Sequence, residues 1–134
     1  MRRVLLDTSA YSAFFRGHEG VVRALQMSDL ICMNPIVLGE LRAGFERGST
    51  RGRNYEQLRE FHSSPRVQLV DITGETSTRY ASILTGLRTA GRPIPTNDLW
   101  IAASAMEHGL RLLTTDRHFR LVSQVLVDYF EALG

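Results

Sequence analysis

Four acidic residues occupy positions in this sequence from which their carboxylates can act together. Asp7 directly follows the apolar run 4–6, and Asp116 follows the stretch LRLLTT. Glu40 lies beside the apolar stripe of PIVLGELRAGFERG, and Asp98 opens the apolar face of NDLWIAASAMEHG. Four carboxylates in one place repel each other strongly unless a cation neutralises them. Mg²⁺ or Mn²⁺ suits such a set of oxygen ligands, and water activated by such an ion can attack phosphorus.

Each of these acids also has an ordinary structural explanation. Asp7 and Asp116 can cap the helices that follow them. Glu40 can be a solvated surface side chain, and Asp98 can favour the dipole at the start of its helix. It is the order and spacing of the whole set that favours a shared site.

The sequence alternates between short apolar runs and segments with helical signals. Thr8 or Ser9 is expected to cap the first helix, which would leave Asp7 free for another role. Further helices are expected at 19–28, 35–47, from about 50 to 62, and at 76–89 and 98–108. Strands are expected at 4–6, 30–33, 67–72, 110–114 and 125–129, of which 67–72 has the strongest strand pattern.

This alternation predicts an α/β fold, a mainly parallel sheet with helices on both faces, built as one domain over residues 1–134. In such folds, sites form at the carboxyl ends of the strands. Asp7 and Asp116 meet that condition. Asp71 is expected inside the strand 67–72 and is interpreted as structural.

Composition excludes several classes of protein. Of 134 residues, 43% are hydrophobic and 22% charged, which indicates a globular chain. A single cysteine, Cys32, excludes an internal disulfide and a cysteine-based zinc site. No apolar run is long enough to span a bilayer, and a cytoplasmic location is expected. The 16 basic residues are all arginine, yet the net charge is only +2, so the chain is not a strongly basic nucleic-acid tail.

Four motifs together, LLDTSA, GELRAG, NDLWIAASA and LLTTDRHF, resemble the PIN domain, and more narrowly the VapC-type toxins of bacterial toxin–antitoxin pairs. The resemblance covers essentially the whole chain. It implies a five-stranded parallel sheet between helices, with Asp7, Glu40, Asp98 and Asp116 as the catalytic, metal-binding acids. The nearby hydroxyls, which would orient ligands or water, are then those of Thr8, Ser9 and Thr114.

The resemblance further implies a Mg²⁺-dependent endoribonuclease, with Mn²⁺ as a substitute, that leaves 5′-phosphate and 3′-hydroxyl ends. It implies a homodimer and a small VapB-like antitoxin that blocks the site. One alternative is a structure-specific or RNA-processing PIN nuclease without an antitoxin. Another is a non-catalytic PIN module that binds RNA or a partner, although all four acidic positions are filled.

The basic side chains near these motifs leave two interpretations open. Arg92, Arg117 and Arg120 either hold substrate phosphate or pair with surface acids. The four histidines, His18, His62, His108 and His118, show no ligand spacing and are expected at the surface or at helix ends.

Overall fold

The protein is built on a five-stranded, all-parallel sheet with the strand order β3-β2-β1-β4-β5. The structure is a computed structural model, and it describes residues 1–133. The α/β fold with a parallel five-stranded sheet, predicted from the sequence, is confirmed. The strands are β1 (Arg3–Leu6), β2 (Leu30–Met33), β3 (Val67–Leu69), β4 (Arg111–Thr114) and β5 (Val127–Tyr129).

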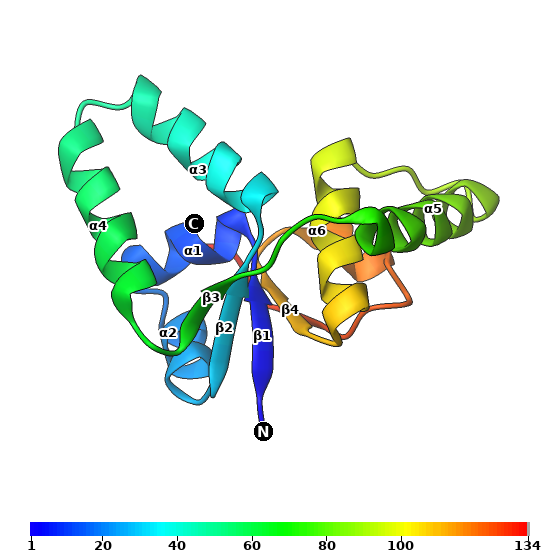
Figure 1. The fold of residues 1–134 in the computed structure, drawn as a ribbon, viewed down its shortest axis with the longest axis horizontal. Helices are drawn as coiled ribbons and strands as arrows, with labels where there is room; N and C mark the ends of the chain where they lie inside the picture. The colour runs from blue at the N-terminus through cyan, green and yellow to red at the C-terminus, as the bar shows by residue number, and fades with distance from the viewer. Residues whose placement is uncertain (134) are drawn as a thin grey trace.

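Six α-helices and one 3₁₀ helix surround the sheet within the described part of the chain. In the view of Figure 1, α1 to α4 lie to the left of β1, and α5 and α6 pack together to its right. None of the helices in residues 1–133 is long and apolar enough to cross a membrane. The helices are α1 (Thr8–Phe15), α2 (Glu19–Gln26), α3 (Pro35–Arg47), α4 (Arg51–Ser63), α5 (Gly74–Thr89), α6 (Thr96–His108) and the 3₁₀ helix η1 (Arg117–Leu121).

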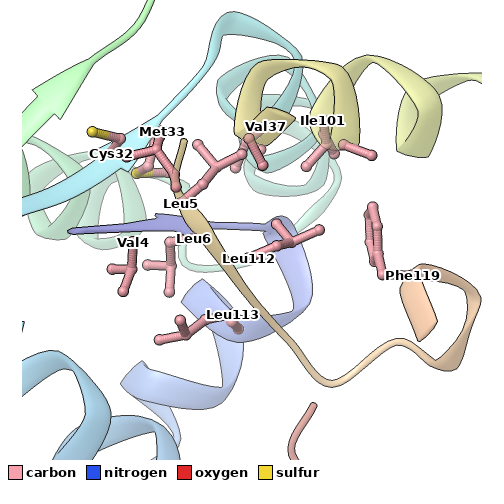
Figure 2. Packing of buried hydrophobic residues seen from close by; sticks show 14 of the residues in the cluster. Val4, Leu5, Leu6, Cys32, Met33, Val37, Ile101, Leu112, Leu113 and Phe119 are labelled. Carbon is pink, nitrogen blue, oxygen red and sulfur yellow. The ribbon is translucent and has the colours of Figure 1, made fainter. Parts of the chain in front are cut away.

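The central strand β1 is buried on both faces, which explains its continuous apolar sequence. Successive side chains of a strand point to opposite faces. Figure 2 accordingly shows Val4 and Leu6 on one side of the sheet, and Leu5 on the other side with Val37 of α3 and Ile101 of α6. The core therefore holds α3 and α6 against the same face of the sheet.

The strand expected at 67–72 is present, but it is shorter than expected and spans only residues 67–69. The strand β3 stops at Leu69, pairs with β2 alone, and lies at the edge of the sheet. Leu69 is 46% exposed, unlike the buried ends of β1, β2 and β4. Asp71 consequently lies beyond the strand, exposed, and not inside it as expected.

The chain order of the strands creates a crevice between β1 and β4. From β1 the chain builds outwards through β2 and β3, and it then crosses back to add β4 and β5 on the other side. Such a reversal separates the connections at the carboxyl ends of the two central strands, where ligands bind in parallel sheets. Leu6 pairs with Leu113 in the last register of β1 and β4, so Asp7 and Thr114 emerge side by side.

A buried amide links the two helices that carry Glu40 and Asp98. Asn34 is 0% exposed and follows β2. Its Oδ1 accepts a hydrogen bond from Val37 N at 3.0 Å, which caps α3. Its Nδ2 donates to Ser104 Oγ of α6 at 2.9 Å. The amide therefore fixes the start of α3 relative to α6.

Replacement of Asn34 by alanine is expected to lower the free energy of unfolding by about 2–3 kcal/mol, because it removes a cap and leaves the buried Ser104 hydroxyl without its partner. Urea denaturation measures this. The matched control is Asn54→Ala, which removes only a surface hydrogen bond to Thr50 Oγ1 and should change stability by less than about 0.5 kcal/mol. Equal effects of the two substitutions would contradict the role given to Asn34.

Candidate active site

Asp7 is both a helix cap and a member of the acidic cluster. Its Oδ1 accepts a hydrogen bond from Ala10 N at 2.8 Å, and its Oδ2 accepts one from Thr114 Oγ1 at 2.7 Å. The hydroxyl of Ser9 donates to the same carboxylate at 2.9 Å. The expectation that Thr8 or Ser9 would cap α1 was therefore wrong: both lie inside the first turn, and Asp7 occupies the cap position.

Burial dominates the electrostatics of Asp7. The residue is 3% exposed, and loss of solvation raises the pKa of its carboxyl from 3.8 to about 6. Its hydrogen bonds to the backbone of Ala10 and to the Thr114 and Ser9 hydroxyls act in the opposite direction, because they stabilise the ionised form. The charged carboxylate therefore costs free energy at neutral pH unless a cation compensates it.

Glu40 reaches the cluster from the side of α3. Its Oε1 accepts a hydrogen bond from Thr8 Oγ1 at 2.6 Å, and its Oε2 accepts one from Asn97 Nδ2 at 3.3 Å. Thr8 belongs to α1 and Asn97 to α6. Hydrogen bonds from two other helices thus orient the Glu40 carboxylate, whereas its place in the sequence, taken alone, favours a solvated residue.

Asp98 and Asp116 form the second half of the cluster, together with His118. Asp98 lies in the first turn of α6 with 13% of its side chain exposed. Burial, followed by the charge of Asp116, raises the pKa of Asp98 from 3.8 to about 6. His118 Nδ1 lies 3.4 Å from Asp98 Oδ2 and 3.2 Å from Asp116 Oδ1. Contact with His118 partly offsets the repulsion between the two carboxylates.

Asp116 is held in place by its own neighbourhood in the chain. Its Oδ1 accepts a hydrogen bond from His118 N at 3.0 Å. Asp116 therefore caps η1, which is the structural role that its place in the sequence indicated. Its backbone N donates to Thr114 Oγ1 at 2.8 Å. Because the Thr114 hydroxyl also donates to Asp7, one side chain connects the two acids at the ends of β1 and β4.

All four predicted acids line one open cavity of about 370 Å³. Asp98, Asp116 and His118 can each present one ligand atom within 4.8 Å of the others, so these side chains can hold a metal ion. Carboxylate oxygens suit hard divalent cations. The cavity is lined by Asp7, Thr8, Ser9, Ser12, Arg16, Glu40, Asp98, Ile101 and Asp116.

Three residues at this site were missed from the sequence. His118 was expected to be an ordinary surface residue, but the turn of η1 returns its ring to Asp98. Ser12 and Arg16 also line the cavity. A signal for these two was present, because Thr8, Ser12 and Arg16 are spaced four apart and share one face of a helix.

The predicted substrate-binding arginines do not line this cavity. Arg117 is paired with Glu131, Nη2 to Oε1 at 3.4 Å, and it also donates to the hydroxyl of Tyr129. The guanidinium of Arg120 stacks over the Tyr129 ring at 5.0 Å. Arg92 is exposed in the loop before α6. For Arg117 the structure thus favours surface pairing, one of the two interpretations left open.

Residues 4–125 match the family model of the PIN domain. The chain belongs to the PIN-domain family. The matched region contains all four motifs, LLDTSA, GELRAG, NDLWIAASA and LLTTDRHF. The resemblance inferred from these motifs is confirmed.

Proteins similar to this PIN-domain chain include VapC ribonucleases and VapBC complexes. Ribonuclease VapC4 of Mycobacterium tuberculosis is 29% identical over 95% of this chain and 96% of its own length. Ribonuclease VapC2 of Haemophilus influenzae is 30% identical over 91% of this chain and 93% of its own length. The crystal structure of VapBC2 from Rickettsia felis, bound to a DNA fragment from its promoter, shares the fold with a TM-score of 0.84, at 23% identity, over 96% of this chain and 98% of that one.

The raised pKa of Asp98 predicts an unusual dependence of stability on pH. Between about pH 4 and 6 the folded protein holds protons that the unfolded chain has already lost, so the free energy of unfolding falls as the pH rises through this range. Asp98→Asn should flatten that slope and, without metal, be about 2 kcal/mol more stable than wild type at pH 7.5.

Urea denaturation in EDTA, between pH 4.5 and 7.5, measures this difference. Asp71→Asn is the matched control, because Asp71 is exposed and lies away from the cavity. If Asp98→Asn had the same pH slope as wild type, burial and the charge of Asp116 would not destabilise the ionised carboxylate of Asp98.

Proposed function

We propose that this protein is the toxin of a type II toxin–antitoxin pair, and that it acts as a metal-dependent endoribonuclease of the VapC type. The observation that carries the proposal is the convergence of Asp7, Glu40, Asp98 and Asp116 on one cavity at the carboxyl ends of β1 and β4. The named activity of the similar proteins, ribonuclease, supports the same reaction.

In this proposal the four acids hold Mg²⁺, for which Mn²⁺ can substitute. Mg²⁺ bound there supplies the Lewis acidity for hydrolysis of a phosphodiester by water. The donor set fits such an ion, because its buried carboxylates have raised pKa values in the absence of positive charge. The sequence of this chain retains every acid of the set, so nothing favours the non-catalytic alternative.

Hydroxyl groups and a histidine next to the acids hold the carboxylates in position. Thr114 and Ser9 orient the carboxylate of Asp7, and Thr8 orients that of Glu40. His118 lies between Asp98 and Asp116 and limits their repulsion before a cation arrives. These contacts keep the ligand atoms in place, so that little reorganisation is needed when substrate binds.

In the proposed reaction water attacks phosphorus, the bond from phosphorus to the 3′-oxygen breaks, and the 2′-hydroxyl takes no part, so the products carry a 5′-phosphate and a 3′-hydroxyl. This chemistry does not by itself distinguish RNA from DNA, and the similarity to ribonucleases favours RNA. We expect specificity to come from single-stranded or loop features of the target, where bases are accessible. Action on cellular RNA would place the protein in the cytoplasm.

We also propose a VapB-like antitoxin as the partner that blocks the cavity, and a homodimer as the form that binds it. The similarity of this fold to VapBC2 of Rickettsia felis supports the antitoxin as a partner. A short gene that overlaps or abuts this one and encodes a DNA-binding N-terminus would identify the antitoxin.

Expression in a host without the antitoxin tests the proposal. Wild type and the control Asp71→Asn should arrest growth and produce new RNA ends at defined sites, whereas Asp98→Asn should do neither, because it removes one acid of the set. Sequencing of 5′ ends, with and without prior phosphorylation by a kinase, reads both the sites and the end chemistry.

Arrest by all three proteins without new ends would indicate toxicity through binding. Neither arrest nor cleavage by folded wild type would remove the toxin assignment. New ends that carry 5′-hydroxyls would contradict the proposed reaction, in which the 3′-oxygen is the leaving group.

A further inference from the structure

We propose that Arg16 forms a phosphate-binding subsite, which holds the RNA backbone next to the phosphodiester that is cut. The inference rests on the proposed ribonuclease function and specifies how its substrate is held.

Thr8, Ser12 and Arg16 line the same cavity from one helix. Their spacing of four residues places them on one face of α1, which Arg16 ends as its C-cap. With a rise of about 1.5 Å per residue, the backbone of Arg16 lies about 12 Å from that of Thr8 along the helix axis. Thr8 contacts Glu40. The stripe therefore begins at the acids and leads away from them, past the small hydroxyl of Ser12.

Charge distinguishes Arg16 from the rest of the cavity. Of the described residues that line it, four are acids and only Arg16 is basic. Many of the other arginines pair with acids: Arg111 binds Asp128 with Nη2 to Oδ1 at 2.7 Å, and Arg79 binds Glu75 at 2.9 Å. Among residues 1–133, no carboxylate forms an ion pair with Arg16, which is exposed.

A polyanion that enters this cavity meets four carboxylates, so it needs a compensating contact. The metal would compensate the phosphate at the point of cleavage, but not the neighbouring phosphates. A guanidinium beyond the acids can bind one of these with two parallel hydrogen bonds. Contacts of this kind fix the register of a nucleic acid without reading its sequence.

Binding of RNA at several salt concentrations tests this role. All proteins carry Asp98→Asn to prevent cleavage, and the probe is a fluorescein-labelled, mixed-sequence, single-stranded RNA followed by anisotropy. Arg16→Ala should weaken binding about tenfold at low salt. It should also reduce the slope of log K against log salt by about 0.7, the value for one lost phosphate contact on a single strand.

Two further variants define the effect. Arg16→Lys should keep the salt slope, because it keeps the charge, but lose part of the affinity, because it loses the bidentate geometry. Arg53→Ala is the matched control, since Arg53 is exposed on α4 and does not line the cavity. It should leave both affinity and slope unchanged. If Arg16 served only to end α1, its replacement would lower the melting temperature without changing the slope.

The outcomes separate this inference from the function on which it rests. If Arg16→Ala binds RNA with the slope of its parent, the subsite is refuted, while cleavage by wild type still supports the ribonuclease. If Arg16→Ala weakens only the association with the antitoxin, the subsite is likewise refuted. If the parent binds no RNA and wild type produces no cuts, the proposed function fails together with the subsite.

Discussion

The rest of this structure depends on one constraint, the concentration of negative charge at the carboxyl ends of β1 and β4. Burial raises the pKa of Asp7, and burial together with the charge of Asp116 raises that of Asp98. A folded chain can keep such groups only where other parts of the structure stabilise them. Three of the acids lie at helix N-termini, Asp7 and Asp116 as caps and Asp98 in a first turn, where unpaired backbone N–H groups favour negative charge.

The same constraint explains the contacts around the acids. The hydroxyls of Thr8 and Thr114 each donate to a carboxylate of the cluster, and the strand order sets the ends of β1 and β4 side by side. The buried amide of Asn34 holds α3 and α6 together at some distance from the cavity. These polar contacts share a physical role, since they fix charged groups that would otherwise separate.

Local patterns were sufficient to predict much of the fold. The expected segments 30–33 and 35–47 coincide with β2 and α3, since apolar runs and an N-terminal proline are local signals. The strand 67–72 was overestimated, because burial of a strand depends on its neighbours in the sheet and not on its own sequence. β3 has one neighbour, and its pairing ends early.

The acids of the site could be found from their order, but their surroundings could not. Asp7 was expected to be either a cap or a functional acid, and its two oxygens allow it to be both. His118 contacts Asp98 across a turn whose path the sequence does not specify. Arg16 lines the cavity because the face of α1 that carries it is turned toward the acids. The packing of α1 against the sheet sets that orientation, and the local sequence does not.

Calorimetric titration of Mg²⁺ into the metal-free protein tests most directly whether these carboxylates share a divalent cation. Ligands must lose their protons to bind metal. Wild type is therefore expected to bind Mg²⁺ saturably and to release protons near pH 6, where Asp7 and Asp98 titrate, but few at pH 8. Asp98→Asn should bind much more weakly, and Asp71→Asn should bind like wild type. Equal binding by wild type and Asp98→Asn, or no binding by folded wild type, would contradict a shared metal centre.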